Sequence, residues 1–212
     1  MPSRVVVFID AQNTYSGARR AFFAKQDDWV HGQFDPMKLA QELTASGSQG
    51  VSRQLEEVRV YRGRPHANKE PKTHSAHMKQ CKAWETSGVT VIARPLRYPL
   101  KWPTEKPEEK GIDVLMALDF VTFAIDDRYD VGILVSVDTD LKPALEYIWR
   151  RTDLGKKVKV AAWRSAQLRG RLSVPGANVW CHWLYKNKLR QGLRPDRLYL
   201  GHVSDRVSLM VI

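Results

Sequence analysis

The chain has 212 residues, of which 43% are hydrophobic and 27% charged, so its composition is that of a globular domain with a modest extension and excludes a disordered chain. Its 34 Lys and Arg outnumber its 23 Asp and Glu, which gives a formal net charge of +11. A surplus of this size favours an anionic partner over a basic protein, and nucleic acid is the first expectation.

No membrane attachment or secretion is expected from the sequence. No apolar run reaches the roughly 18 residues that a membrane span needs. The uninterrupted apolar run that follows Arg4 has only five residues, fewer than the core of a signal peptide requires. We therefore expect a cytoplasmic protein, in which Cys81 and Cys181 are free thiols because cytosolic thiols are usually reduced.

The first half of the chain alternates apolar runs with helical patterns. Residues 5–9 form a continuous β-branched run, typical of a strand that is covered on both faces. Asp35 and Pro36 are a typical helix cap and first turn. In chain order the predicted elements are a strand at 5–9, a helix or loop at 11–20, a helix at 35–43, a loop at 45–52, a strand at 55–62 and a helix at 73–87.

The same alternation continues in the second half. The predicted elements are a strand at 89–94, an irregular Pro-rich segment at 95–107, a helix at 112–125, a strand at 131–137, a helix at 141–151 and a strand at 158–163. Beyond Arg164 the pattern weakens, and 180–184 and 198–203 are candidates for short strands or an extension. Such alternation predicts an α/β fold with a mainly parallel sheet.

Acidic residues follow two of the buried strands. Asp10 ends the first strand, and Asp138 and Asp140 follow the strand at 131–137. Functional groups gather at the carboxyl ends of strands in open α/β sheets, so these acids are candidates for one site. Magnesium favours carboxylate oxygen ligands, and without a cation the carboxylates would repel one another. A helix cap or turn is the alternative role for each Asp, above all for Asp140.

A further acidic pair lies in the apolar helix predicted at 112–125. Asp113 is in the first turn, where the helix dipole also favours an anion. Asp119 lies deeper in the helix, where a charge requires a partner. At 3.6 residues per turn the two side chains point about 120° apart, so we rank Asp119 below Asp113 as a ligand and expect a supporting role for it.

The net charge is concentrated between Lys156 and Arg197, where eleven basic residues face the single acid Asp196 and account for +10 of the total. Aromatic residues are interleaved with them, and aromatic faces stack on unpaired bases. Core aromatics within a solvated basic surface are the alternative. The residues that we expect to contact nucleic acid are Lys110, Lys156, Lys157, Arg164, Arg169, Arg171, Lys186, Lys188 and Arg190.

A weaker signal lies in the helix at 73–87. His74, His77 and Cys81 are spaced to share one face of this helix, and all three are possible zinc ligands. The sequence offers no fourth ligand. A polar helix face with a partly buried thiol is the preferred interpretation.

Three segments taken together carry a resemblance to a known family. They are Phe8-Ile9-Asp10-Ala11-Gln12-Asn13, Lys110-Gly111-Ile112-Asp113 with Asp119, and Ser136-Val137-Asp138-Thr139-Asp140. Their order and spacing, over residues 4–163, resemble the NYN domain family, a branch of the PIN-like nucleases. The sequence departs from the family pattern at Val137, Thr139 and Leu141, where the family usually has Gly, Ser and Phe, but every acid of the pattern is present.

The resemblance implies a PIN-like domain at residues 1–165 with a three-layer α/β/α fold. It does not extend to residues 166–212, which we expect to form a basic extension that packs on the domain or continues it. It implies cleavage of RNA, with Mg²⁺ or Mn²⁺ as cofactor. Asp10, Asp113 and Asp138 would hold the metal, Asp140 would support them, and Asn13 would act near the metal or the phosphate. Three alternatives remain open: DNA as the substrate, an oligomeric state, and a non-catalytic nucleic-acid-binding module on the same fold.

Overall fold

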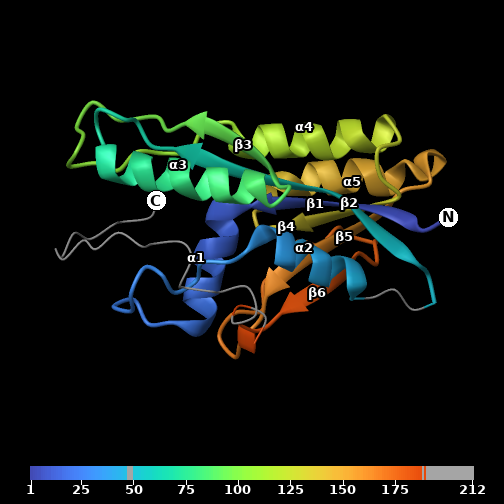
Figure 1. The fold of residues 1–212 in the computed structure, drawn as a ribbon. Coiled ribbons are helices and arrows are strands. Elements are labelled where there is room, and N and C mark those ends of the chain that lie inside the picture. Colours follow the sequence, from blue (N-terminus) through green and yellow to red (C-terminus); the bar gives the residue numbers. More distant parts are fainter. Residues whose placement is uncertain (47–49, 188, 190–212) are drawn as a thin grey trace.

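The computed structural model describes residues 1–46, 50–187 and 189 (Figure 1). Within this part of the chain, strands alternate with helices as the sequence predicts. The elements are β1 (Ser3–Asp10), α1 (Ala11–Phe22), α2 (Pro36–Ala45), β2 (Arg53–Arg64), α3 (Pro71–Thr86), β3 (Thr90–Pro95), α4 (Ile112–Ile125), β4 (Val131–Val135), the short 3₁₀ helix η1 (Thr139–Leu141), α5 (Lys142–Arg150), a second 3₁₀ helix η2 (Thr152–Leu154), β5 (Lys157–Trp163) and β6 (Trp180–Leu184).

The described strands form one sheet of six, all parallel, in the order β3-β2-β1-β4-β5-β6. From β1 the chain builds outward through β2 to β3, and it then returns to add β4 on the other side of β1. The strand order therefore reverses between β1 and β4. In open α/β sheets the crevice for ligands lies at the carboxyl ends of the strands at this reversal.

Helices cover both faces of the sheet, so the predicted three-layer α/β/α fold is confirmed. Val5, Val7 and Ile9 of β1 belong to the core under α1, α2 and α3, and Val6 and Phe8 belong to the core under α4 and α5. In Figure 1, α4 and α5 run side by side on one side of the sheet, and α2 lies on the other. A strand that alternates between two cores must be apolar throughout, which explains the continuous run of residues 5–9.

Local chemistry explains where the elements begin and end. The Asp35 carboxylate accepts a hydrogen bond from Lys38 N at 3.1 Å and so caps α2 as predicted. Gly88 follows α3 with a φ of 91°, a left-handed conformation that glycine adopts without strain. The strand predicted at 131–137 ends two residues early, at Val135. Ser136 and Val137 leave the ladder because they bond to Asp10 and Asn13 instead.

The chain after residue 165 continues the sheet. The strand β6 pairs in parallel with β5, from Trp180 opposite Lys159 to Leu184 opposite Trp163. Leu172, Val174 and Val179 lie in the core beneath α4 and α5. The described part of the extension is thus built into the fold, whereas the candidate strand at 198–203 lies outside the described residues.

The two cysteines do not form a disulfide bond with each other. Cys81 and Cys181 are buried free thiols. Among the described helices none is long and apolar enough to span a membrane.

Candidate active site

The carboxyl ends of β1 and β4 are joined by a network of side-chain hydrogen bonds. Asp10 Oδ1 caps α1 by accepting from Asn13 N at 2.8 Å, and Asp10 Oδ2 accepts from Ser136 Oγ at 3.0 Å. Asn13 Oδ1 accepts from Val137 N at 3.1 Å, and Ser136 Oγ accepts from Asp138 N at 3.0 Å. Asp10, Asn13 and Asp138 are therefore held together at the strand reversal, as the strand-end argument predicts.

Asp10 is the most buried carboxylate of this edge, with 4% of its surface exposed. Burial disfavours its charged form and raises its pKa to about 7, although the bonds from Asn13 and Ser136 lower it. Asp113 and Glu109 raise it further because they are like charges nearby. A carboxylate in this environment gains most from a neighbouring cation.

Asp113 brings α4 into the same site. Gly111 precedes the helix in a left-handed conformation, with a φ of 74°, so the chain turns sharply just before Asp113. The pKa of Asp113 is raised by burial and by the neighbouring carboxylates Asp138 and Asp140. Asp138 accepts from Asp140 N at 2.9 Å, which keeps both acids on one short turn.

Glu109 is a fifth member of the cluster that the sequence argument missed. Its Oε1 accepts a hydrogen bond from Gly63 N, close to the end of β2. Burial raises its pKa, and Asp113 raises it further. The available signal was an acid four residues before Asp113, directly ahead of the Lys110-Gly111 turn. We call Asp10, Glu109, Asp113, Asp138 and Asp140 the carboxylate cluster.

The chemistry of the carboxylate cluster fits a hard divalent cation. Within the described residues, no Lys or Arg forms an ion pair with any of its five acids. In the same part of the chain, no three His, Cys, Asp or Glu side chains are close enough together to hold one ion. Magnesium typically uses only one or two carboxylates and fills its other positions with water and phosphate oxygens. The cluster therefore fits Mg²⁺ or Mn²⁺ by charge and donor type, without a closed cage of protein ligands.

Asp119 lies in a different environment from Asp113 on the same helix. Its Oδ2 accepts from Arg59 Nη2 at 2.8 Å and from Tyr61 Oη at 2.7 Å. The charge of Asp119 is thus compensated by a guanidinium and a hydroxyl group of β2. This placement gives Asp119 a structural role, and we leave it out of the site.

The zinc candidates of α3 also have other partners. His77 Nε2 lies 3.3 Å from Cys81 Sγ, and His74 Nδ1 lies 2.8 Å from the Pro65 carbonyl oxygen. Burial lowers the pKa of His77 to about 3, so the ring is neutral. The arrangement is the polar helix face with a buried thiol that the sequence favoured.

The structure divides the basic region between the two edges of the sheet. Lys156 precedes β5 and pairs with Asp127, and Lys157 is the first residue of that strand. The last residue of β5, Trp163, lies six positions after Lys157, about 20 Å away at 3.3 Å per residue. Lys156 and Lys157 thus lie at the amino edge, opposite the carboxylate cluster, and do not share a footprint with it.

The other predicted basic residues are spread over the same divide. Arg164 follows β5 at the carboxyl edge and stacks on Trp183, and Lys186 lies over the Phe23 ring. Arg171 donates to the Val179 carbonyl oxygen at 3.1 Å, next to the start of β6, and Arg169 is exposed. Lys110 pairs with Glu108 at 3.2 Å. Lys188 and Arg190 lie outside the described residues.

Three arginines at the carboxyl edge were not predicted from the sequence. Arg62 and Arg64 end β2, and Arg94 lies at the end of β3. The Arg94 guanidinium is exposed and lies against Gly111, two residues from Asp113. No charge run marks these arginines, because they belong to separate strands that the sheet brings together.

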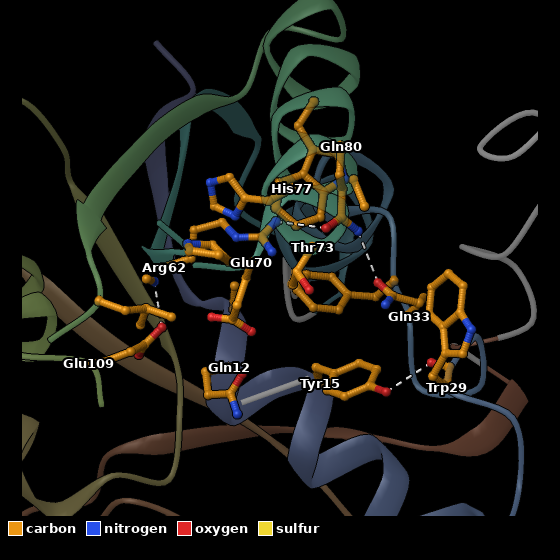
Figure 2. A pocket seen from close by; sticks show the side chains of 17 residues that line it. Gln12, Tyr15, Trp29, Gln33, Arg62, Glu70, Thr73, His77, Gln80 and Glu109 are labelled. Atoms are coloured by element: carbon orange, nitrogen blue, oxygen red, sulfur yellow. Dashed lines mark hydrogen bonds between the residues drawn. The ribbon is translucent and has the colours of Figure 1, made fainter. Parts of the chain in front are cut away.

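Two hollows flank Glu109. One is a groove along α4 and α5, lined among others by Lys110, Asp113, Asp140 and Tyr147. The other is a pocket of about 100 Å³ between α1, α3 and the end of β2. Figure 2 shows this pocket with Gln12 and Tyr15 of α1 on one side and Thr73, His77 and Gln80 of α3 on the other. Its lining residues are Ala11, Gln12, Tyr15, Trp29, Gln33, Phe34, Arg62, Gly63, Pro65, Glu70, Thr73, Ala76, His77, Gln80, Trp84, Leu96 and Glu109.

Comparison with known proteins identifies the family. The chain is similar in fold to a crystal structure of a protein of unknown function from Vibrio parahaemolyticus, with a TM-score of 0.56 and 19% identity over 87% of this chain and 93% of that one. No curated protein matches the chain. The family model of the NYN domain matches residues 4–170, which include every member of the carboxylate cluster. This match covers most of the chain, and the protein belongs to the NYN domain family of PIN-like nucleases.

Proposed function

We propose that the protein is a divalent-metal-dependent ribonuclease, in which the carboxylate cluster is the catalytic centre. The observation that carries the proposal is five acids with no ion-pair partner among the described residues, at the strand reversal of a nuclease-family fold. Asp119, on the same helix as Asp113, is instead paired with Arg59. Unpaired carboxylates that raise one another's pKa cost stability, and a bound cation relieves that cost.

In the proposal Asp10, Asp113 and Asp138 would hold Mg²⁺ or Mn²⁺, and Asp140 would support them. Because no three of the described acids converge on one ion, part of this binding would run through water molecules. Such an ion supplies an activated water and neutralises charge on the scissile phosphate. Asn13 positions the loop after β4 through its bond from Val137 N. This bond fixes the orientation of the Asn13 amide, whose NH₂ group would donate to a phosphate oxygen.

The two hollows beside Glu109 support an endonuclease. A groove on one side and a pocket on the other allow an RNA strand to cross the carboxylate cluster, so that neither end of the RNA has to lie in the site. The exposed arginine Arg94 stands at this crossing, next to Gly111. RNA is the proposed substrate, and a DNA strand of the same sequence is the comparison that tests this choice.

The test is cleavage of an end-labelled single-stranded RNA with Mg²⁺, Mn²⁺ or EDTA, with the wild type beside Asp138→Asn. Asparagine keeps the cap on Asp140 N and removes only the charge. We expect internal cuts that disappear both in EDTA and in the variant. Cutting that survives in either case would contradict the proposed centre.

A second candidate is a binding module without cleavage, favoured by the fact that no three-ligand metal group is formed within the described residues. This candidate predicts that RNA binds equally well in EDTA and that Asp138→Asn binds at least as tightly as the wild type. The nuclease predicts a metal requirement for cutting. The same labelled RNA measures both.

Arg94→Gln tests the arginine beside the cluster. If Arg94 contacts a phosphate, the variant binds single-stranded RNA more weakly, and the slope of log K against log salt falls by about 1. The matched control is Arg150→Gln, an exposed arginine at the end of α5 near the amino edge. Binding isotherms at four salt concentrations measure both, and equal slopes for the two variants would exclude Arg94 from the footprint.

A further inference from the structure

We infer that the pocket between α1 and α3 binds one unstacked nucleobase of a single-stranded substrate, beside the phosphate that the carboxylate cluster attacks. The inference rests on the proposed function and adds to it a site for base recognition. It stands on the shape of the pocket, its polar groups and its distribution of charge.

The size and position of the pocket suit one ring next to the catalytic centre. A cavity of about 150 Å³ holds a benzene ring. The pocket has a volume of about 100 Å³, smaller than that cavity, but it opens to solvent, so one heterocycle can enter it with an edge left at the mouth. Glu109 belongs both to its wall and to the carboxylate cluster, and Ala11 and Gln12 follow Asp10 directly. A nucleotide whose phosphate lies at the cluster therefore has its base within reach of the pocket.

The polar groups in the wall are fixed in orientation. Arg62 Nη1 donates to Gln80 Oε1 at 2.7 Å, and Gln80 Nε2 donates to Gln33 Oε1 at 3.0 Å (Figure 2). Each of the two amide carbonyls accepts one of these bonds, and the amide NH₂ group of Gln33 remains as a donor. Amide side chains held in this way are suited to reading the edge of a base.

Further polar atoms of the wall are left for a ligand. His77 is 4% exposed, and among the described residues its Nδ1 has no hydrogen-bond partner. A buried polar atom without a partner is rare, and a ligand or ordered water is the usual explanation. Gln12 Nε2 makes only a long contact of 3.4 Å to Ser16 Oγ.

Aromatic residues complete the wall. Tyr15 is held in place by a bond of 2.8 Å from its hydroxyl to the Trp29 carbonyl oxygen. Phe34 and Trp84 lie 6.1 Å apart between ring centroids. Rigid aromatic surfaces bind bases of any sequence by stacking.

The charge of the pocket favours a base over a phosphate. The lining residues include two carboxylates, Glu70 and Glu109, and one guanidinium, Arg62, which already donates to Gln80, so their net charge repels an anionic group. A carboxylate accepts hydrogen bonds from the exocyclic amine of cytosine, adenine or guanine, whereas uracil has no such amine. The pocket should therefore prefer an amine-bearing base to uracil.

The experiment uses fluorescein-labelled single-stranded RNAs of nine nucleotides. Within one set the strands differ only at one position, which carries C, A, G, U or no base. Further sets place this variable position at each other point along the strand. Binding is measured by anisotropy in EDTA, and cleavage of the same strands is measured in Mg²⁺. For the wild type we expect one position at which removing the base weakens binding about tenfold, the effect of losing one stacked base. At that position C, A or G should bind more tightly than U.

The variant Gln33→Leu with Gln80→Leu keeps the volume of the wall and removes its amides. We expect it to reduce the spread among the bases and the abasic strand to less than twofold. Gln33→Leu alone is the milder variant should the pair unfold. The matched control is Gln54→Leu, an exposed glutamine at the amino edge of the sheet, which should keep the wild-type spread.

The outcomes separate the inference from the proposed function. Cleavage that needs metal but ignores the abasic position overturns the base pocket and leaves the nuclease standing. A base preference in binding that depends on Gln33 and Gln80, without any cleavage, supports the pocket and overturns the nuclease. A base preference that survives in the double variant places base recognition elsewhere and overturns the inference.

Discussion

Asp113→Asn should abolish metal-dependent RNA cleavage, lowering the rate by at least about 100-fold, the scale on which catalytic acid–base groups act. Asp113 is the carboxylate of α4 that raises the pKa of Asp10 and is itself influenced by Asp138 and Asp140. Removing its charge takes one member from the carboxylate cluster. Single-turnover cleavage of end-labelled RNA in Mg²⁺ measures the loss.

The matched control for this variant is Asp119→Asn, the same change six residues along the same helix. Asp119 forms an ion pair with Arg59 and accepts from Tyr61, so its loss should destabilise the fold by about 2 kcal/mol, the typical value of hydrogen bonds to a charged group. We expect Asp113→Asn to lose cleavage and keep its stability, and Asp119→Asn to do the reverse. The assignment of both residues would be contradicted if Asp119→Asn lost cleavage at full stability.

The metal-free protein should lose stability as the pH rises from about 4 to 7 because of Asp10. The pKa of Asp10 rises from the model-peptide value of 3.8 to about 7 on folding, mainly through burial. Between these values the folded state binds more protons than the unfolded state, so the free energy of unfolding falls with increasing pH. At 1.36 kcal/mol per pKa unit, the full effect is about 4 kcal/mol.

Urea denaturation in EDTA at pH 4.5, 6 and 8 tests this dependence with Asp10→Asn. We expect the free energy of unfolding of the variant, relative to that of the wild type, to rise from pH 4.5 to about pH 7 and to level off by pH 8. Mg²⁺ should reduce this difference, because it stabilises the ionised cluster of the wild type. Asp35→Asn makes the same change at the cap of α2, outside the cluster. A difference that does not vary with pH would exclude ionisation of buried Asp10 as its cause.

Local patterns in the sequence determined the fold. The apolar run at 5–9 predicts a strand covered on both faces, and β1 does lie between two cores. The helix predicted at 112–125 matches α4 at both ends. Such patterns succeed because the periodicity of burial and the caps are properties of neighbouring residues. The same reasoning brought Asp10 and Asp138 to one edge of the sheet.

The site residues that the sequence argument did not find depend on contacts between distant segments of the chain. Glu109 follows no strand, so the strand-end argument does not find it, and a hydrogen bond from Gly63 N near the end of β2 holds it in the cluster. Arg94 lies beside Gly111 because β3 ends there. The basic residues from Lys156 onward appear as one continuous run in the sequence. In the structure they lie at opposite edges of the sheet, because β5 runs from one edge to the other.

The sequence by itself determined the order of strands and helices, the family and the acids at the strand ends, since each of these depends on residues that are close together in the sequence. Only the tertiary structure decided that Asp119 pairs with Arg59, that Glu109 belongs with Asp113, and that a pocket lies between α1 and α3. The physical reason is that side-chain pairing and pockets depend on how the elements pack. Two residues of the same type on one helix therefore have different roles: Asp113 lies in the carboxylate cluster, and Asp119 pairs with an arginine.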